Sequence, residues 1–90
     1  MKKQNFAVIT VSQKDLDHHF STSGKAFYID YESGEWQYHE NPHVWVPKSI
    51  CRFSETNDVG NLTVAIPMWF LTKNQLDYHR LENFTDVIYQ

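Results

Sequence analysis

The chain has 90 residues, a formal net charge of −3 and one cysteine, Cys51. A chain of this length buries only about 60–65% of the surface that its unfolded form exposes, and one cysteine cannot form an intrachain disulfide, so the apolar core must supply the stability. The scattered basic residues exclude a basic face for duplex DNA, and no apolar run is long enough to span a membrane or to form a signal-peptide core. We therefore expect one cytoplasmic domain, residues 1–90, whose core depends on an aromatic content of 16%.

The first part of the chain predicts a strand, a helix and a turn. Residues 6–11 are rich in β-branched side chains, which favours a strand. Residues 12–20 form either a short helix or a polar loop; Ser12 is a suitable N-cap, and Asp15 occupies the capping-box position. Small polar residues at 21–24 then predict a turn.

The middle of the chain predicts a hairpin followed by a further strand. Alternation over residues 25–31 predicts a strand with two distinct faces, one carrying Phe27, Ile29 and Tyr31 and the other carrying Ala26, Tyr28 and Asp30. A glycine-containing turn at residues 32–35 predicts a hairpin into residues 36–39. Residues 43–46 are again strand-like, and Pro47 ends that run.

The last part of the chain predicts two strands and a helix. A polar loop at residues 57–61 precedes a short apolar strand at residues 62–66. Pro67 stops this strand and is expected in the first turn of a short helix that runs over about residues 68–76. Residues 84–89 favour a last strand, in a tail whose structure the pattern leaves ambiguous.

Together these elements predict an α+β fold, with a small, curled, mostly antiparallel sheet and one or two short helices. The sheet is expected to have about five strands and to be barrel-like in shape. Trp45, on a predicted strand, and Trp69, on the predicted helix, are expected in the core because a buried tryptophan removes a large apolar area from water.

Histidines supply the sharpest candidate for a metal site. His39 and His43 flank a carboxylate within five residues, and His18 and His19 form a second pair that could complete the ligand shell. Two histidines four residues apart converge only on a helix, and Pro42 makes a helix there unfavourable. We therefore expect no metal and no cofactor.

The sequence shows no catalytic residues. Cys51 lies in no pattern typical of a nucleophile, and an isolated cysteine in an apolar strand is usually buried. Residues 21–25 contain a Gly-Lys pair without the other residues of a phosphate-binding loop. Asp30, Glu32 and Glu35 line the tip of the predicted hairpin, where paired carboxyl groups are expected to stay solvated. We therefore expect that the protein is not an enzyme.

Aromatic side chains on adjacent predicted strands have two interpretations. The set consists of Phe27, Tyr28, Tyr31, Trp36, Tyr38 and Trp45. A sheet face of this kind can stack single-stranded bases, at about 1–3 kcal/mol per base. The alternative is that half of these side chains form the core and the rest cover its edges, and the lack of a basic groove favours this second interpretation.

Three segments of the sequence, taken together and in this order, match the motifs of a known group of proteins. They are Lys25-Ala26-Phe27-Tyr28-Ile29, Trp45-Val46-Pro47-Lys48-Ser49, and Ile66-Pro67-Met68-Trp69-Phe70 followed by Asn74-Gln75-Leu76. Together they resemble a group of small bacteriophage and mobile-element proteins over about residues 21–76. The resemblance implies an origin and an architecture rather than a mechanism. Two regions depart from the group: residues 36–43 lengthen the hairpin, and the tail after Leu76 extends beyond the group's usual end.

We therefore predict a non-enzymatic accessory or inhibitor-type binding protein of phage or mobile-element origin, which acts on a host or phage protein. The partner-binding residues are expected in and beside the hairpin extension: Trp36, Tyr38, His39, His43 and Tyr31. The alternative is that these side chains cover an exposed edge of the sheet. A single-stranded nucleic-acid-binding module with an aromatic sheet face is the second hypothesis, and a small metal-dependent enzyme is the third. No membrane partner is expected, and a homodimer stays open.

Overall fold

The computed structural model describes residues 4–31, 43–56 and 59–89. These residues contain six strands: β1 (Asn5–Ser12), β2 (Ala26–Asp30), β3 (His43–Pro47), β4 (Arg52–Glu55), β5 (Asn61–Pro67) and β6 (Phe84–Tyr89). They also contain two α-helices and two 3-10 helices: α1 (Gln13–Asp17), α2 (Met68–Lys73), η2 (Lys48–Ile50) and η3 (Tyr78–Arg80). None of the helices in these ranges is long and apolar enough to cross a membrane.

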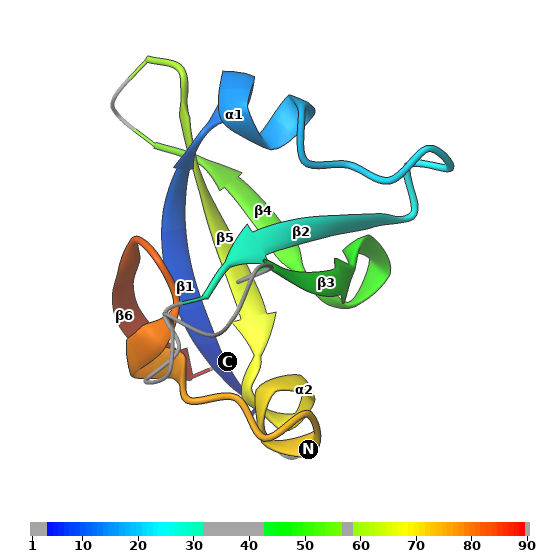
Figure 1. Cartoon of the computed structure of the whole chain (residues 1–90). Coiled ribbons are helices and arrows are strands. Elements are labelled where there is room, and N and C mark those ends of the chain that lie inside the picture. Colours follow the sequence, from blue (N-terminus) through cyan, green and yellow to red (C-terminus); the bar gives the residue numbers. More distant parts are fainter. Residues whose placement is uncertain (1–3, 32–42, 57–58, 90) are drawn as a thin grey trace.

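The larger sheet has four antiparallel strands in the order β4-β5-β1-β6 (Figure 1). The pairing of β1 with β5 places Ala7 opposite Ile66 and Ile9 opposite Val64. All four side chains are buried, and they share one face of the sheet because side chains alternate along a strand. That face forms one wall of the core.

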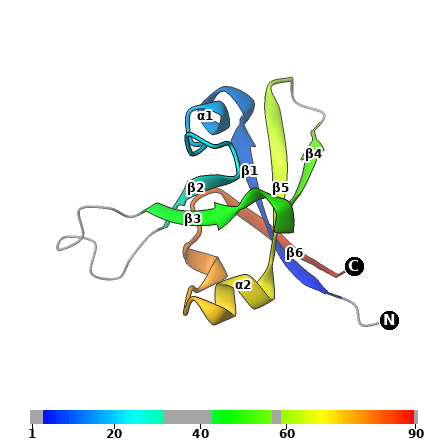
Figure 2. The same cartoon turned by 90° about the vertical axis from the view of Figure 1, so that its right-hand side faces the viewer.

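The smaller sheet consists of β2 and β3, which run across the larger sheet, as Figures 1 and 2 show. Phe27 and Ile29 of β2 and Val46 of β3 belong to the same buried cluster as the apolar side chains of β1 and β5. The Phe27 ring meets the rings of Phe20 and Phe53 edge-on, at centroid distances of 5.9 and 5.5 Å. The core therefore lies between two crossed sheets.

Of the two alternatives for residues 12–20, the structure shows the short helix: α1 begins at Gln13, and Ser12 is its N-cap. The Oγ atom of Ser12 accepts a hydrogen bond from the N–H of Asp15 (3.3 Å), which satisfies one of the backbone donors left unpaired at a helix start. The helix buries Leu16 in the core and ends at Asp17. It lies at the opposite end of the larger sheet from α2 (Figure 1).

The helix α2 is shorter than predicted. The N–H of Leu76 donates to the carbonyl oxygen of Leu71 (2.8 Å), a hydrogen bond typical of a Schellman C-cap. Gln75 adopts the left-handed conformation that this cap requires (φ 58°), so the helix ends at Lys73. Pro67 precedes the first turn as the last residue of β5 instead of lying inside the helix.

The predicted α+β fold with a mostly antiparallel sheet is confirmed, but the sheet does not close into a barrel. There are six strands in the described residues rather than about five. The predicted strand at residues 84–89 is confirmed as the edge strand β6, which pairs with β1, whereas β4 was not predicted. The predicted strand at residues 36–39 lies outside the described residues. Pro47, which has no N–H to donate, ends β3, and η2 turns the chain before β4 begins. The result is two sheets packed against each other instead of one curled sheet.

The prediction that Trp45 and Trp69 lie in the core is wrong, since they are 53% and 48% exposed. In β3 the core-facing residue is Val46, and the neighbouring residue of a strand points to the opposite face. In α2 the buried residue is Leu71, and a residue two positions earlier lies on the other side of a helix. Both tryptophans therefore contribute to the surface.

Candidate functional site

Three ring side chains lie side by side on the outer face of the smaller sheet: His19, Tyr28 and Trp45. Tyr28 and Trp45 are register partners on β2 and β3, and their rings meet edge-on at 5.4 Å. His19, which follows α1, stacks on the Tyr28 ring at 4.1 Å with an interplanar angle of 16°. We call these three residues the aromatic row. Its position follows from strand alternation, because the preceding pair, Phe27 and Val46, fills the core.

Hydrogen bonds hold His19 against Tyr28. The N–H of Tyr28 donates to the carbonyl oxygen of His19 (3.0 Å), and the Nδ1 atom of His19 lies 3.2 Å from the carbonyl oxygen of Tyr28. A carbonyl oxygen only accepts, so Nδ1 of His19 is the donor in this contact. Two rings of the aromatic row are thus fixed in place within the chain itself.

Trp45 is the exposed end of the aromatic row. More than half of its surface is accessible, whereas His19 and Tyr28 are half-buried. Within the described residues β3 pairs with β2 alone, so Trp45 projects from an edge strand. A large, ordered aromatic side chain at an edge is well placed to contact another molecule.

A small hollow lies beside the aromatic row and has a volume of about 160 Å³. His19 and Tyr28 form part of its wall, and apolar side chains such as Ile9 and Leu16 contribute to its lining. Pockets for small-molecule ligands usually measure about 300–1,000 Å³. This hollow therefore has room for a single side chain rather than for a whole metabolite.

Three carboxyl groups line the hollow, from Asp15, Asp30 and Glu82, and no Lys or Arg of the described residues does. The N–H of Glu82 donates to the carbonyl oxygen of Asp30 (3.0 Å), which brings the two residues together. A side-chain hydrogen bond with Asp30, together with partial burial and the Asp30 charge, raises the pKa of Glu82, and the charge of His19 acts in the opposite direction. We call this feature the acidic hollow.

Of the predicted partner-binding residues, Trp36, Tyr38 and His39 lie outside the described residues. The described residue His43 is the first of β3, where its backbone pairs with that of Asp30. The segment that contains the first three connects β2 to β3, the two strands that carry Tyr28 and Trp45.

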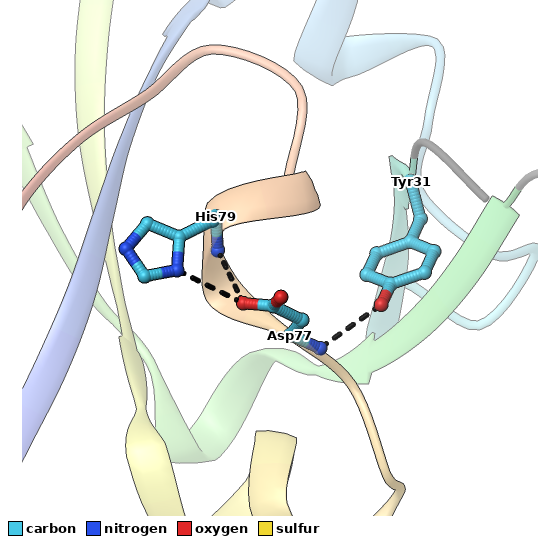
Figure 3. A network of polar contacts seen from close by, with 3 residues as sticks. All are labelled: Tyr31, Asp77 and His79. Atoms are coloured by element: carbon cyan, nitrogen blue, oxygen red, sulfur yellow. Dashed lines mark hydrogen bonds and ion pairs between the residues drawn. The ribbon is translucent and has the colours of Figure 1, made fainter. Parts of the chain in front are cut away.

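Tyr31 directly follows β2, and its half-buried ring packs against the core. Figure 3 shows its hydroxyl group next to the segment that leads into η3, where it accepts a hydrogen bond from the N–H of Asp77 (2.9 Å). The Oδ1 atom of Asp77 in turn accepts from the N–H of His79 (3.0 Å) and lies 3.1 Å from Nδ1 of the same residue. The backbone hydrogen bond from His79 lowers the pKa of Asp77. Tyr31 thus ties the end of β2 to η3, and its role in partner binding stays a prediction.

Cys51 lies between η2 and β4, and its Sγ atom is 3.7 Å from the carbonyl oxygen of Pro47. Burial raises the pKa of the Cys51 thiol to about 12, so the sulfur is a neutral thiol at pH 7 and a poor nucleophile. Among the described residues, no three His, Cys, Asp or Glu side chains are grouped so that they could hold a metal ion. The acidic hollow can attract a cation and can take up or release a proton.

No pattern in the sequence indicates that His19 and Glu82 belong to one site. From the sequence, Asp30 is expected among the acids of the hairpin tip, whereas in the structure it lies next to Glu82, in the turn before β6. A backbone bridge between Tyr31 and Leu81 brings these two segments together. This contact joins distant parts of the chain, and no local pattern of residue types encodes it.

Comparisons with protein-family models, with curated proteins and with solved structures found no match. The function is therefore inferred from the chain's own residues and geometry.

Proposed function

We propose that the chain is a non-enzymatic binding domain that docks a protein partner on the aromatic row. Trp45 carries this proposal, because it is 53% exposed on an ordered edge strand and rests edge-on against Tyr28. Tryptophan and tyrosine are enriched at binding hot spots, where they offer a large contact area with few rotatable bonds. The stack of His19 on Tyr28 holds the row in one arrangement, so less side-chain entropy is lost when a partner binds.

A single-stranded nucleic acid is the second class of partner that an aromatic row can bind, through base stacking. Nucleic-acid binding also depends on basic side chains that neutralise the phosphates. Beside this row lie the carboxyl groups of Asp15, Asp30 and Glu82, which repel phosphates when ionised. The charge around the row therefore favours a protein partner.

The proposal includes a cytoplasmic location and an accessory or inhibitory action on a host or phage protein. The single cysteine is consistent with a reducing compartment, and the phage or mobile-element origin is supported by the sequence resemblance over residues 21–76. Residues 36–43 are included as an extension of the binding surface, since they precede Trp45 and connect the two strands of the row.

Affinity capture from a lysate of the natural host cells tests the proposal with three immobilised proteins: the wild type, Trp45→Ala and Trp69→Ala. Trp69 is a matched control because it is a tryptophan of similar exposure on a different element, α2. We expect one protein to be retained by the wild type and by Trp69→Ala and to be lost with Trp45→Ala. Retention of that protein by Trp45→Ala contradicts the proposal. Capture that is destroyed by nuclease and weakened steeply by salt supports the nucleic-acid alternative instead.

A further inference from the structure

We infer that the outer edge of β4 is a second binding surface, which takes up an extended segment of a partner protein as an additional strand of the larger sheet. The segment carries an apolar residue opposite Phe53 and an acidic residue near Lys25 and Lys48. This surface shares no residue with the aromatic row, so the inference goes beyond the proposed function. It is carried by the open hydrogen-bonding groups of β4 and by two hollows beside them.

The backbone of β4 offers hydrogen-bonding groups on its outer side. Directly after β4, the N–H of Thr56 donates to the carbonyl oxygen of Asn61 (3.4 Å), in register with the ladder between β4 and β5. Hydrogen-bonded residues alternate along an antiparallel ladder, so the N–H and C=O groups of Phe53 and Glu55 point away from β5. No residue of the described ranges forms a hydrogen bond with these groups. They are therefore free to pair with an added strand.

The outer edges of β6 and β3 are less suited to such pairing. On β6 the outward N–H of Val87 already donates to the Oδ1 atom of Asp86 (2.8 Å). On β3 the last residue, Pro47, has no N–H to donate. The outward N–H groups of Phe53 and Glu55 are both present and, in the part of the chain that the structure describes, both unpaired. The edge of β4 is therefore the better template for an added strand.

Two hollows lie beside this edge, on the face of the sheet that carries the Phe53 ring. Their volumes are about 430 and 520 Å³, and both are lined by Phe53 and Lys48. Leu16 of α1 lines the first hollow, and Lys25, just before β2, lines the second. In Figure 1 the segment that leads into β2 extends well past β4, and Figure 2 shows it in a different layer. Side chains of an added strand on this face therefore enter a partly covered space.

The second hollow favours an acidic side chain. Lys25 and Lys48 line it, and no Asp or Glu of the described residues does. The Nζ atom of Lys48 lies 5.2 Å from the centre of the Phe20 ring, and neither lysine forms an ion pair within the described ranges. A carboxylate of a partner thus meets two cations without displacing an existing ion pair. Next to the lysines, the Phe53 ring offers a contact for an apolar side chain.

A free segment fits this edge better than a second copy of the chain does. Two copies that join their β4 edges about a twofold axis form one continuous sheet, and their second layers lie on the same face of it. The segment before β2 extends past β4 in each copy, so the two second layers meet in the same space (Figures 1 and 2). An extended segment without a second layer avoids this collision.

An NMR titration of the full chain with blocked pentapeptides tests the inference. The main probe has phenylalanine at its third position, aspartate at its fifth and threonine elsewhere. Antiparallel to β4, its phenylalanine lies opposite Phe53 and its aspartate lies near the lysines. We expect saturable shifts of the amide signals of β4 in the millimolar range. The absence of a saturable shift overturns the inference.

Methylated probes test whether the backbone of the segment is recognised. The phenylalanine N–H of the probe faces β4, whereas the N–H of the preceding threonine faces away. Methylation of the phenylalanine nitrogen should weaken binding by about tenfold or more, because a hydrogen bond is lost and the methyl group meets β4. Methylation of the threonine nitrogen should change the affinity little. Equal effects of the two methylations contradict strand addition.

Charge variants locate the acidic residue of the probe. Replacing its aspartate with asparagine should weaken binding to the wild type several-fold and have little effect on binding to Lys25→Gln/Lys48→Gln. Lys73→Gln, on α2 and outside both hollows, should behave like the wild type. Lys25→Gln alone provides the same comparison in case the double variant does not fold. Equal binding of the aspartate and asparagine probes to the wild type overturns the acidic assignment.

Hydrogen exchange tests the edge itself. In the free chain the amides of Phe53 and Glu55 should exchange rapidly, and that of Ser54, which pairs with β5, should exchange slowly. The bound probe should slow exchange at Phe53 and Glu55. Protection of the Phe53 amide that rises with protein concentration in the absence of the probe indicates a second copy and contradicts the inference. Because Trp45→Ala tests the aromatic row separately, failure of one proposal leaves the other standing.

Discussion

The two faces of the smaller sheet should respond very differently to mutation. Phe27 and Trp45 lie on the same two-stranded sheet, but Phe27 is fully buried and Trp45 is 53% exposed. Replacing a buried phenylalanine with alanine removes its transfer free energy and leaves a cavity, so Phe27→Ala should lower the free energy of unfolding by about 3–5 kcal/mol. The Trp45 side chain buries roughly 100 Å² on folding, and at about 25 cal/mol per Å² its removal should lower the free energy of unfolding by at most about 2.5 kcal/mol. Part of this area is already buried in the unfolded chain, so the expected loss for Trp45→Ala is about 1–2 kcal/mol.

Urea unfolding followed by far-UV circular dichroism measures both values, without depending on the fluorescence of the tryptophan that is replaced. The two variants should differ by about 1–4 kcal/mol, and each kcal/mol corresponds to roughly 4–8 °C in melting temperature for a domain of this size. Trp45→Ala should remain folded and suitable for binding studies. If Trp45→Ala is destabilised as much as Phe27→Ala, Trp45 is a core residue after all and the placement of the aromatic row on the surface is wrong.

Three further substitutions test individual contacts. The raised pKa of Glu82 means that the folded state binds this proton more tightly than the unfolded state, so the wild type loses stability as the proton dissociates. The melting temperature of Glu82→Gln should therefore rise relative to that of the wild type as the pH increases above the usual glutamate pKa of about 4.3. A difference in melting temperature that is independent of pH contradicts this. Gln75→Gly should increase the free energy of unfolding by about 0.5–1 kcal/mol in urea titrations, since glycine adopts the left-handed conformation without steric cost, and a decrease would argue against the C-cap. Tyr31→Phe removes the acceptor for the N–H of Asp77 and should cost about 0.5–1.5 kcal/mol, with hydrogen exchange of that amide accelerated; unchanged exchange would mean that the bond is not maintained in solution.

Much of the secondary structure could be predicted from local patterns. Alternation in residues 25–31 indicated that Phe27 and Ile29 share a face, and both are buried in β2. Ser12 marked the start of α1 because its hydroxyl group satisfies a backbone donor, a role that depends only on nearby residues. Local periodicity and capping act within a few residues, so they are visible in the sequence.

Residue type alone does not show which face of β3 is buried. Val44, Trp45 and Val46 are all apolar, so alternation alone does not show which face is buried, and the size of tryptophan favoured the core. In the structure the large ring of Phe27 lies opposite the smaller Val46, and this pair fills the space between the crossed sheets. Trp45 is left on the outer face with Tyr28.

The candidate site depends on contacts between distant segments, which explains why the sequence did not reveal it. Glu82 meets Asp30 because the end of β2 pairs with the turn before β6. His19 reaches Tyr28 because the segment after α1 runs back along β2. The spacing of residues along the sequence predicts neither contact. Local patterns likewise do not determine the number of strands or their division into two sheets.

Site-specific photo-crosslinking in host cells tests the central claim most directly. A photoreactive phenylalanine derivative is introduced either at Trp45, on the aromatic row, or at Trp69, which has similar exposure on α2. The proposed function predicts a discrete crosslinked protein with the probe at position 45, which disappears when Tyr28→Ser is added, and no such product with the probe at position 69. A crosslinked protein obtained at position 69 and not at position 45 would contradict the claim that the aromatic row is the binding surface.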